Sequence, residues 1–237
     1  MKRLLIIIFT CIILFNSCKK DTLTDNIYSD LIPFNEIELN CTFDVYLKED
    51  SSFSINIIGD KNVIENVSYV IENNVLKINN DSKFKWLTPR KNKIEIYINS
   101  KPLKFVSAKQ TCFIKTLSPI TSDEFGIMLS NKANQASLEL DCKIFYYWNN
   151  FPCGGKLTLY GNTESLKIWN YAIMSVDARN LNANNAIVEN NSKGNCDVTV
   201  LNSFEYSIKG EGDINLYGSP PKIIEKQITS SGQLIRH

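Results

Sequence analysis

Apolar side chains recur along the second half of the chain at a nearly constant interval. Four leading apolar positions, Ile168, Val188, Ile208 and Ile228, are each twenty residues apart. Each period contains about two short alternating runs separated by Gly- or Asn-rich turns. One such coil cannot bury its own apolar face, whereas coils stacked at about 4.8 Å pair their backbones and share a core. The pattern predicts an all-β solenoid of stacked two-strand coils of about 20 residues, with little helix.

The same period can be followed back toward the middle of the chain. Counting from Ile168, the leading positions are Tyr147, Ile127 and Phe105, with spacings of 21, 20 and 22 residues. We expect these residues to point into the core. Their neighbours along each strand then point outward, because successive side chains of a strand face opposite sides.

The turn residues of these periods are types that tolerate left-handed backbone conformations. Two residues after each leading apolar position, the chain has Asn170, Asn190, Gly210 and Ser230. Asn side chains on successive coils can stack as an amide ladder, as they do in cross-β structures. We therefore expect Asn149, Asn170 and Asn190 to form such a ladder.

The glycines of Gly210-Glu211-Gly212 do not indicate a phosphate-binding loop. Such a loop needs a helix N-terminus directly after the glycines, and Ile214-Asn215-Leu216 continues as a strand. We interpret the glycines as the corner of one coil. Calcium binding by oxygen ligands at this turn is an alternative, but the turn lacks a multi-acid loop.

The N-terminal half is also rich in predicted strands, beginning at Phe34. Residues 63–67 fit a helical turn, and Asn73-Asn74 fits the two-residue turn of a hairpin. Residues 83–93 are basic and carry Trp86, which indicates an exposed loop. This loop could contact anionic lipid or polysaccharide, or it could simply be solvated.

The first residues are typical of an export signal. Lys2 and Arg3 precede a mainly apolar stretch of twelve residues, 4–15, which is too short to span a bilayer that needs about 20 apolar residues. Asn16-Ser17-Cys18 then resembles the cleavage box of bacterial lipoproteins, which makes Cys18 the lipidated residue. A conventional signal peptide and an uncleaved anchor are the alternatives.

These features divide the chain into three parts. Residues 1–17 are the predicted signal peptide, residues 18–30 are a flexible polar tether, and residues 31–237 are the solenoid domain. We expect the lipid to anchor the protein in the outer membrane, on its periplasmic or cell-surface face.

Cysteine content and charge narrow the possible functions. Five cysteines remain after Cys11 is removed and Cys18 is lipidated: Cys41, Cys112, Cys142, Cys153 and Cys196. Cys142 and Cys153 are the nearest pair and could form a disulfide in an exported protein, or all five could be small buried apolar residues. None has the CxxC spacing of zinc or redox motifs. The net charge of +1 indicates no nucleic-acid partner.

Several segments resemble the family described as putative auto-transporter adhesin, head GIN domain. The resemblance rests on the opening Phe34-Asn35-Glu36-Ile37, on Phe43-Asp44-Val45-Tyr46-Leu47 and on Val75-Leu76-Lys77-Ile78. It is clearest at the end of the chain, in residues 210–220 and 230–234. The resemblance implies a right-handed β-solenoid, often on exported lipoproteins, and it brings no catalytic residues with it.

Enzymatic chemistry has little support in the sequence. The only histidine is His237, so a Ser-His or Cys-His nucleophile would depend on the terminal residue. Acidic pairs occur at Asp123-Glu124 and at Glu211 with Asp213, but both are typical of turns. No cofactor or metal is expected.

Aromatic residues indicate a possible ligand platform. If Tyr147 and Ile168 point inward, Trp148 and Trp169 point outward on adjacent coils. Together with Tyr146 and Tyr171, they could stack against a sugar ring or a peptide. The alternative is that the tryptophans fold over a turn and cover the edge of the core.

Three functions follow from these observations. The first is a non-enzymatic adhesion module of the cell envelope that recognises a glycan or a surface protein. The second is a structural or assembly component of the envelope without a small ligand, and the third is a carbohydrate-active enzyme. An exposed aromatic face in a hollow favours the first, an open solenoid end favours the second, and a cleft with two carboxyl groups favours the third.

Overall fold

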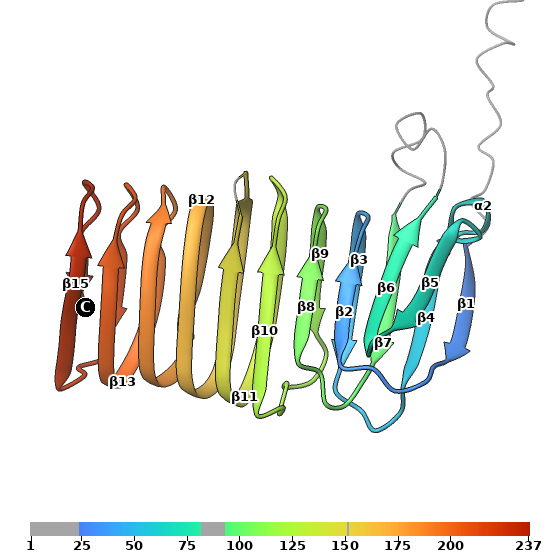
Figure 1. Ribbon diagram of the computed structural model, residues 1–237, viewed down its shortest axis with the longest axis horizontal. Helices are drawn as coiled ribbons and strands as arrows, with labels where there is room; N and C mark the ends of the chain where they lie inside the picture. The colour runs from blue at the N-terminus through green and yellow to red at the C-terminus, as the bar shows by residue number, and fades with distance from the viewer. Residues whose placement is uncertain (1–23, 82–92, 151) are drawn as a thin grey trace, which may run out of the picture.

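Strands make up most of the structure, and they stack into an elongated solenoid (Figure 1). The computed structural model describes residues 24–81, 93–150 and 152–237. These residues contain one short helix, α2 (Lys61–Ile64). The strands are β1 (Thr24–Asp30), β2 (Glu36–Leu39), β3 (Phe43–Lys48), β4 (Ser54–Asp60), β5 (Val67–Glu72), β6 (Val75–Asn80), β7 (Ile94–Asn99), β8 (Phe105–Ala108), β9 (Cys112–Thr116), β10 (Glu124–Leu129), β11 (Asn134–Asn149), β12 (Gly154–Ser192), β13 (Cys196–Ile208), β14 (Ile214–Tyr217), β15 (Lys222–Ile228) and β16 (Leu234–Arg236).

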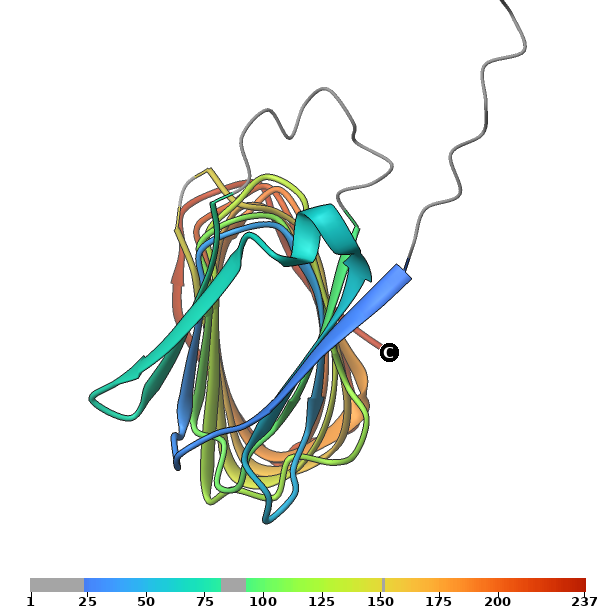
Figure 2. The same cartoon turned by 90° about the vertical axis from the view of Figure 1, so that its right-hand side faces the viewer.

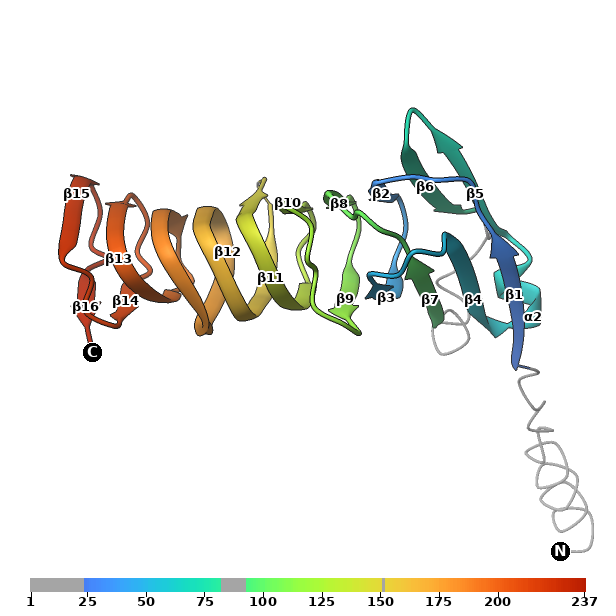
Figure 3. The ribbon, with the colours of Figure 1, turned by 90° about the horizontal axis from the view of Figure 1, so that it is seen from below.

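Two walls of mainly parallel strands enclose the core, as the view along the axis in Figure 2 shows. The first wall contains β6, β2, β8 and β10, and the second contains β7, β3 and β9. The long strand β11 bends between the walls, since its first half pairs with β9 and its second half with β10. Figure 3 shows the walls on opposite sides of the axis. The winding is right-handed, so the predicted fold class is confirmed.

One continuous apolar row runs along the inside of the first wall. Ile37 pairs with Val106, Val106 with Ile127, and Ile127 with Tyr147. Tyr147 in turn pairs with Ile168. None of these five side chains is more than 1% exposed. Stacking of this kind buries apolar surface from every coil, at about 25 cal/mol for each Å² removed from water.

The sequence prediction of this row fails at one position. Val106, and not Phe105, is the inward residue of β8, so the spacing to Ile127 is 21 residues. A shift of one residue reverses the face of a strand side chain, and Phe105 therefore lies on the outer surface. The apolar pattern could not decide between the two, because Phe105 and Val106 are both apolar and adjacent.

The period itself shortens by two residues in one coil. Ala186 pairs with Phe204, 18 residues further on, after register shifts between residues 178 and 185. As a result Ile208 lies beside Asn190, and not beside Val188 as the twenty-residue spacing predicts. A shift of two residues keeps each side chain on its predicted face. Val188 and Ile208 are accordingly both buried.

Buried asparagines replace apolar residues at one corner of the coils. Asn170 Nδ2 donates to Asn190 Oδ1 at 3.0 Å, and Asn190 Nδ2 donates to the carbonyl of Gly212 at 2.9 Å. The expected ladder is thus confirmed between Asn170 and Asn190. Asn149 is also buried, but its side chain bonds the backbone N–H and carbonyl of Tyr171 at 2.7 and 2.8 Å. It belongs to a separate contact.

Antiparallel strands cover the N-terminal end of the solenoid. β5 and β6 form a hairpin whose turn residues, Asn73 and Asn74, have φ angles of 52° and 65°. These positive angles suit the two-residue hairpin turn that the sequence predicts. On the other wall, β4 pairs antiparallel with β7. Asp60 accepts a bond from the backbone N–H of Asn62 and begins α2, close to the predicted helical turn.

The coils at this end do not follow the order of the sequence. β2 lies between β6 and β8, and β3 lies between β7 and β9. The coil built from β2 and β3 therefore lies between two layers that both come later in the sequence. These are the layer of β6 and β7, toward the N-terminal end of the solenoid, and the coil of β8 and β9 on the other side.

The predicted tether is shorter than expected. Residues 24–30, which the sequence analysis assigns to the tether, form β1 and pair antiparallel with β4 along its whole length. Ile27 packs against the core from this strand. An edge strand needs only a few apolar residues because most of its side chains face water, and its polar composition was therefore misleading.

Several predictions concern residues outside the described ranges. They are the signal peptide 1–17, the lipidated Cys18, the first part of the tether and most of the basic loop. Lys93, at the end of that loop, forms ion pairs with Glu95 at 2.7 Å and Asp44 at 3.5 Å. In the described ranges, no helix has the length and apolarity to cross a membrane.

The cysteines act as small core residues. No disulfide joins the five described cysteines, and four of them, Cys112, Cys142, Cys153 and Cys196, are buried. The apolar interpretation is therefore confirmed for these four cysteines over the alternative pairing of Cys142 with Cys153.

The amide ladder generates a stability prediction. Asn190→Ala removes the bonds of this side chain to Asn170 Nδ2 and to the carbonyl of Gly212, while Asn170 Nδ2 keeps its bond to the carbonyl of Met174. The loss of two buried hydrogen bonds costs about 1–3 kcal/mol. We expect the free energy of unfolding, measured by urea denaturation, to fall by about that amount. Asn184→Ala, at an exposed asparagine, is the matched control and should change it by less than about 0.5 kcal/mol. Equal effects of the two substitutions would contradict the ladder.

A second prediction concerns alkaline solution. Burial raises the pKa of Cys112 and Cys196 to about 12 and that of Cys142 to about 11, whereas an unfolded thiol ionises near pH 8.5. Because these folded-state pKa values are raised, the free energy of unfolding should stay constant below about pH 8.5 and decrease toward pH 11. The slope should approach about 1.4 kcal/mol per pH unit for each thiol.

Urea unfolding under reducing conditions measures this decrease. Cys196→Ala should start from a lower midpoint, because it leaves a cavity, and then decline less steeply. A midpoint that does not change up to about pH 10.5 would show that the thiols do not control alkaline stability.

Candidate ligand-binding site

Two outward rows cross the first wall next to the N-terminal end. Each row follows from the strand register and consists of residues that share one level of the wall. The first row is Glu36, Phe105, Gly126, Tyr146 and Lys167. The second row is Glu38, Ser107, Met128, Trp148 and Trp169.

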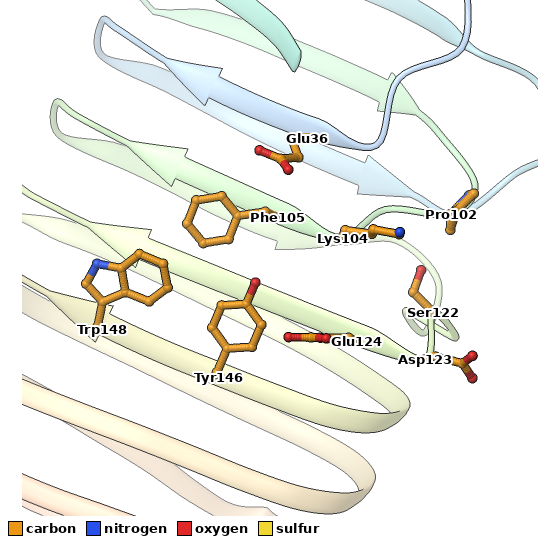
Figure 4. Close-up of a pocket in the computed structure, with 9 residues that line it drawn as sticks. All are labelled: Glu36, Pro102, Lys104, Phe105, Ser122, Asp123, Glu124, Tyr146 and Trp148. Atoms are coloured by element: carbon orange, nitrogen blue, oxygen red, sulfur yellow. The ribbon is translucent and has the colours of Figure 1, made fainter. Parts of the chain in front are cut away.

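Three near-parallel, offset-stacked rings from these rows form an aromatic surface, which we call the aromatic pavement: Phe105, Tyr146 and Trp148. The ring centroids of Phe105 and Trp148 are 5.0 Å apart, and those of Tyr146 and Trp148 are 5.7 Å apart. Phe105 and Tyr146 are 6.1 Å apart. All three planes lie within 17° of one another. Figure 4 shows the rings side by side with their faces turned the same way.

The missing side chain of Gly126 makes this arrangement possible. Gly126 lies between Phe105 and Tyr146 in the first row, and a Cβ atom built there would meet the Tyr146 ring at 2.1–2.7 Å. The Tyr146 ring therefore lies over the backbone of β10. Any other residue would force the ring off the wall, because real Cβ contacts are never this short.

The pavement borders a hollow of about 520 Å³. Its lining combines the three rings with polar and charged residues from the start of the strands and from the preceding loops (Figure 4). The polar and charged residues are Glu36, Lys104, Ser122, Asp123 and Glu124, and Pro102 completes the rim.

The charges around the hollow are unequally compensated. Asp123 forms an ion pair with Lys143 at 2.9 Å, and Glu38, beside the hollow, pairs with Lys109 at 2.7 Å. Burial, followed by the negative charges of Glu124 and Glu36, raises the pKa of Tyr146 above its usual value. The hydroxyl of Tyr146 thus lies in a net negative environment.

The predicted platform is only partly assembled. Trp148 and Trp169 are strand partners on adjacent coils and both are half-buried on the outer face, as expected. However, Trp148 leans toward Phe105, and no ring contact joins it to Trp169 in the described structure. The space between the two indoles is a second, more open hollow of about 410 Å³, lined by Trp148, Asn149, Asn150, Trp169 and Tyr171.

Tyr146 and Trp148 therefore belong to the pavement, while Trp169 and Tyr171 belong to the second hollow. The hydroxyl of Tyr171 donates to Glu189 at 2.9 Å, which fixes that ring at the edge of the hollow. Phe105, Gly126, Glu36 and Glu124 belong to the candidate site but were not among the predicted platform residues. The sequence did contain a sign of the outward Phe105. Phe105 and Val106 are adjacent apolar residues of one strand, so one of the two has to face outward.

Three of the four acidic residues considered for catalysis make local contacts, and one of the three, Asp123, pairs with Lys143 as described above. Glu211 pairs with Lys193 at 3.1 Å, and Asp213 accepts a bond from the backbone N–H of Gln233 at 2.9 Å, which are turn contacts. His237 stacks on Tyr217 with ring centroids 4.4 Å apart. Within the described ranges, no cluster of three or more His, Cys, Asp or Glu side chains could hold a metal ion.

Comparison with known families identifies the domain. The sequence profile described as putative auto-transporter adhesin, head GIN domain, matches residues 33–220. The chain belongs to this family. No match was found among curated proteins.

Solved structures of similar fold carry related names. A putative adhesin from Bacteroides fragilis NCTC 9343 is 18% identical with a TM-score of 0.83, over 90% of this chain and 97% of that chain. A putative adhesin from Parabacteroides distasonis ATCC 8503 is 17% identical with a TM-score of 0.62, over 92% and 98%. A putative lipid binding protein from the same strain is 17% identical with a TM-score of 0.63, over 90% and 96%. At this identity, the likeness establishes a shared fold.

The head GIN fold places Gly126 where its substitution can test the pavement. Gly126→Val should displace the Tyr146 ring, because the new side chain occupies the space of that ring. Since Tyr146 stacks on Trp148, we expect a clear change in tryptophan fluorescence and near-ultraviolet circular dichroism, with the far-ultraviolet spectrum retained. Gly232→Val, in a corner far along the chain, is a control for the general cost of replacing a glycine. Unchanged near-ultraviolet spectra in Gly126→Val would refute this packing.

Proposed function

We propose that this protein is a lipid-anchored adhesion module of the cell envelope that binds a glycan on the aromatic pavement. The membership of an adhesin-named family supports a role at the cell surface or outside the cytoplasm. The residues before the fold support the anchor, since an export signal followed by Cys18 fits lipoprotein processing.

The single observation that carries glycan binding is the aromatic pavement, the three near-parallel rings of Phe105, Tyr146 and Trp148. The apolar C–H face of a pyranose ring packs well on an aromatic face, which combines a large apolar area with a defined geometry. The hollow beside the pavement offers carboxylate, hydroxyl and ammonium groups that can bond the sugar hydroxyls. A ligand site of this kind, apolar with a few convergent polar groups, is the usual form of a small-molecule site.

A glycan fits better than the two other candidates. A structural component without a ligand would not require three near-parallel rings on its outer face, one of which fits only because Gly126 has no side chain. A carbohydrate-active enzyme would require two carboxyl groups on either side of a scissile bond. The two carboxyl groups of the hollow that lack an ion pair in the described structure, Glu36 and Glu124, instead project from the same outward face of the first wall. We therefore favour binding without turnover.

A glycan array probed with the full chain tests this function. Trp148→Ala should weaken binding to any recognised glycan by about tenfold or more, equivalent to at least about 1.4 kcal/mol. Trp169→Ala is the matched control, since it removes an indole from the neighbouring hollow and should change affinity by less than about threefold.

Two results would argue against the proposal. Glycan binding that survives Trp148→Ala unchanged would remove the pavement from the site. A larger loss in Trp169→Ala than in Trp148→Ala would move the site to the hollow between the two indoles.

A further inference from the structure

The carboxylates of Glu36 and Glu124 stand apart from the other acidic groups of the first wall. In the described part of the chain, neither takes part in an ion pair, although their neighbours Glu38 and Asp123 are both paired with lysines at 2.7 and 2.9 Å. Both line the hollow next to the pavement. Two negative groups are thus left without a partner at the place where a ligand would lie.

Lysines near the hollow do not cancel this charge. Lys104 is the one lysine that lines it and can offset a single carboxylate. Lys167 lies on the other side of Tyr146 in the outward row and does not line the hollow. The charged groups that raise the pKa of Tyr146 are Glu124 and Glu36, with no lysine among the causes.

We infer that the pavement selects a sugar with a free amino group, a hexosamine whose ammonium pairs with the carboxylate of Glu36 or of Glu124. The inference rests on the proposed function and names the ligand class of the same site. An ammonium group forms charge-assisted hydrogen bonds with carboxylates, which are about twice as strong as neutral ones. The aromatic faces add attraction for the same charge.

A saccharide fits this site better than a lone basic side chain. The three ring planes lie within 17° of one another instead of surrounding one point, so their near-parallel faces match a ring-shaped ligand with an apolar face. A hexosamine presents that face and an ammonium on the same ring. N-acetylation keeps the ring and removes the charge, which gives a natural comparison.

Calorimetric titration of the full chain with two probes tests the inference. The probes are a hexasaccharide of glucosamine and the same hexasaccharide fully N-acetylated. We expect the free-amine form to bind at least tenfold more tightly at low salt. This preference should shrink toward about twofold at high salt, because ion pairs at an open site are screened.

The double variant Glu36→Gln/Glu124→Gln should lose the preference. It should bind both hexasaccharides within about twofold of each other while keeping its affinity for the N-acetylated form, since the pavement is unchanged. Glu139→Gln/Glu211→Gln is the matched control: it removes two exposed carboxylates elsewhere and should keep the preference. A preference lost equally in both double variants would indicate nonspecific attraction and overturn the inference.

Failure of the inference and failure of the proposed function give different results. Binding of both hexasaccharides without a preference, still weakened by Trp148→Ala, overturns the amino-sugar inference alone. Absence of any glycan whose binding depends on Trp148 overturns both. Glu36- and Glu124-dependent binding of hexalysine in the absence of saccharide binding also overturns the inference and identifies a basic peptide as the partner.

Discussion

Backbone pairing between successive coils is the interaction on which the rest of this structure depends. Each inner strand of the solenoid bonds a strand of the layer on either side, so the register of one pair fixes the level of every side chain in the row. The apolar row from Ile37 to Ile168 and the outward row from Glu36 to Lys167 are two products of the same registers. A buried amide such as Asn170 can then replace an apolar residue, because the strand register places its hydrogen-bond partner Asn190 at the same level of the next coil.

The sequence predicted the faces of the strands better than their levels. Val188 and Ile208 are both inward, as their spacing indicates, yet they occupy different levels because one coil lost two residues at a corner. A shift of two residues leaves the inward and outward alternation of a strand unchanged, so the alternation in the sequence does not reveal it. By contrast, Phe105 and Val106 form an apolar pair in which alternation gives no answer, and only the pairing of Val106 with Ile127 decides which one faces the core.

The same limit explains how much of the candidate site could be foreseen. Tyr146 and Trp148 stood out in the sequence because they flank an inward tyrosine. Their partner Phe105 comes from another coil, and Glu36 comes from a strand that lies nearly 70 residues before Phe105 in the chain. The role of Gly126 is a matter of space, because it is defined by the Tyr146 ring above it. Such relations exist only after the coils are stacked, and no local pattern records them.

The position of the coil formed by β2 and β3 has a consequence for how the chain reaches its fold. From β8 onward, each new coil can add to the one just completed, as in other linear repeats. The coil of β2 and β3 is different, because one of its two neighbours is built from β6 and β7, which follow it in sequence. Forming that layer pairs β2 with β6 and β3 with β7, which are far apart in the sequence, and such non-local pairing is slow. Closure of the N-terminal end is therefore expected to limit the rate of folding, although this end is synthesised first. The later coils then add to the N-terminal coils that have already formed.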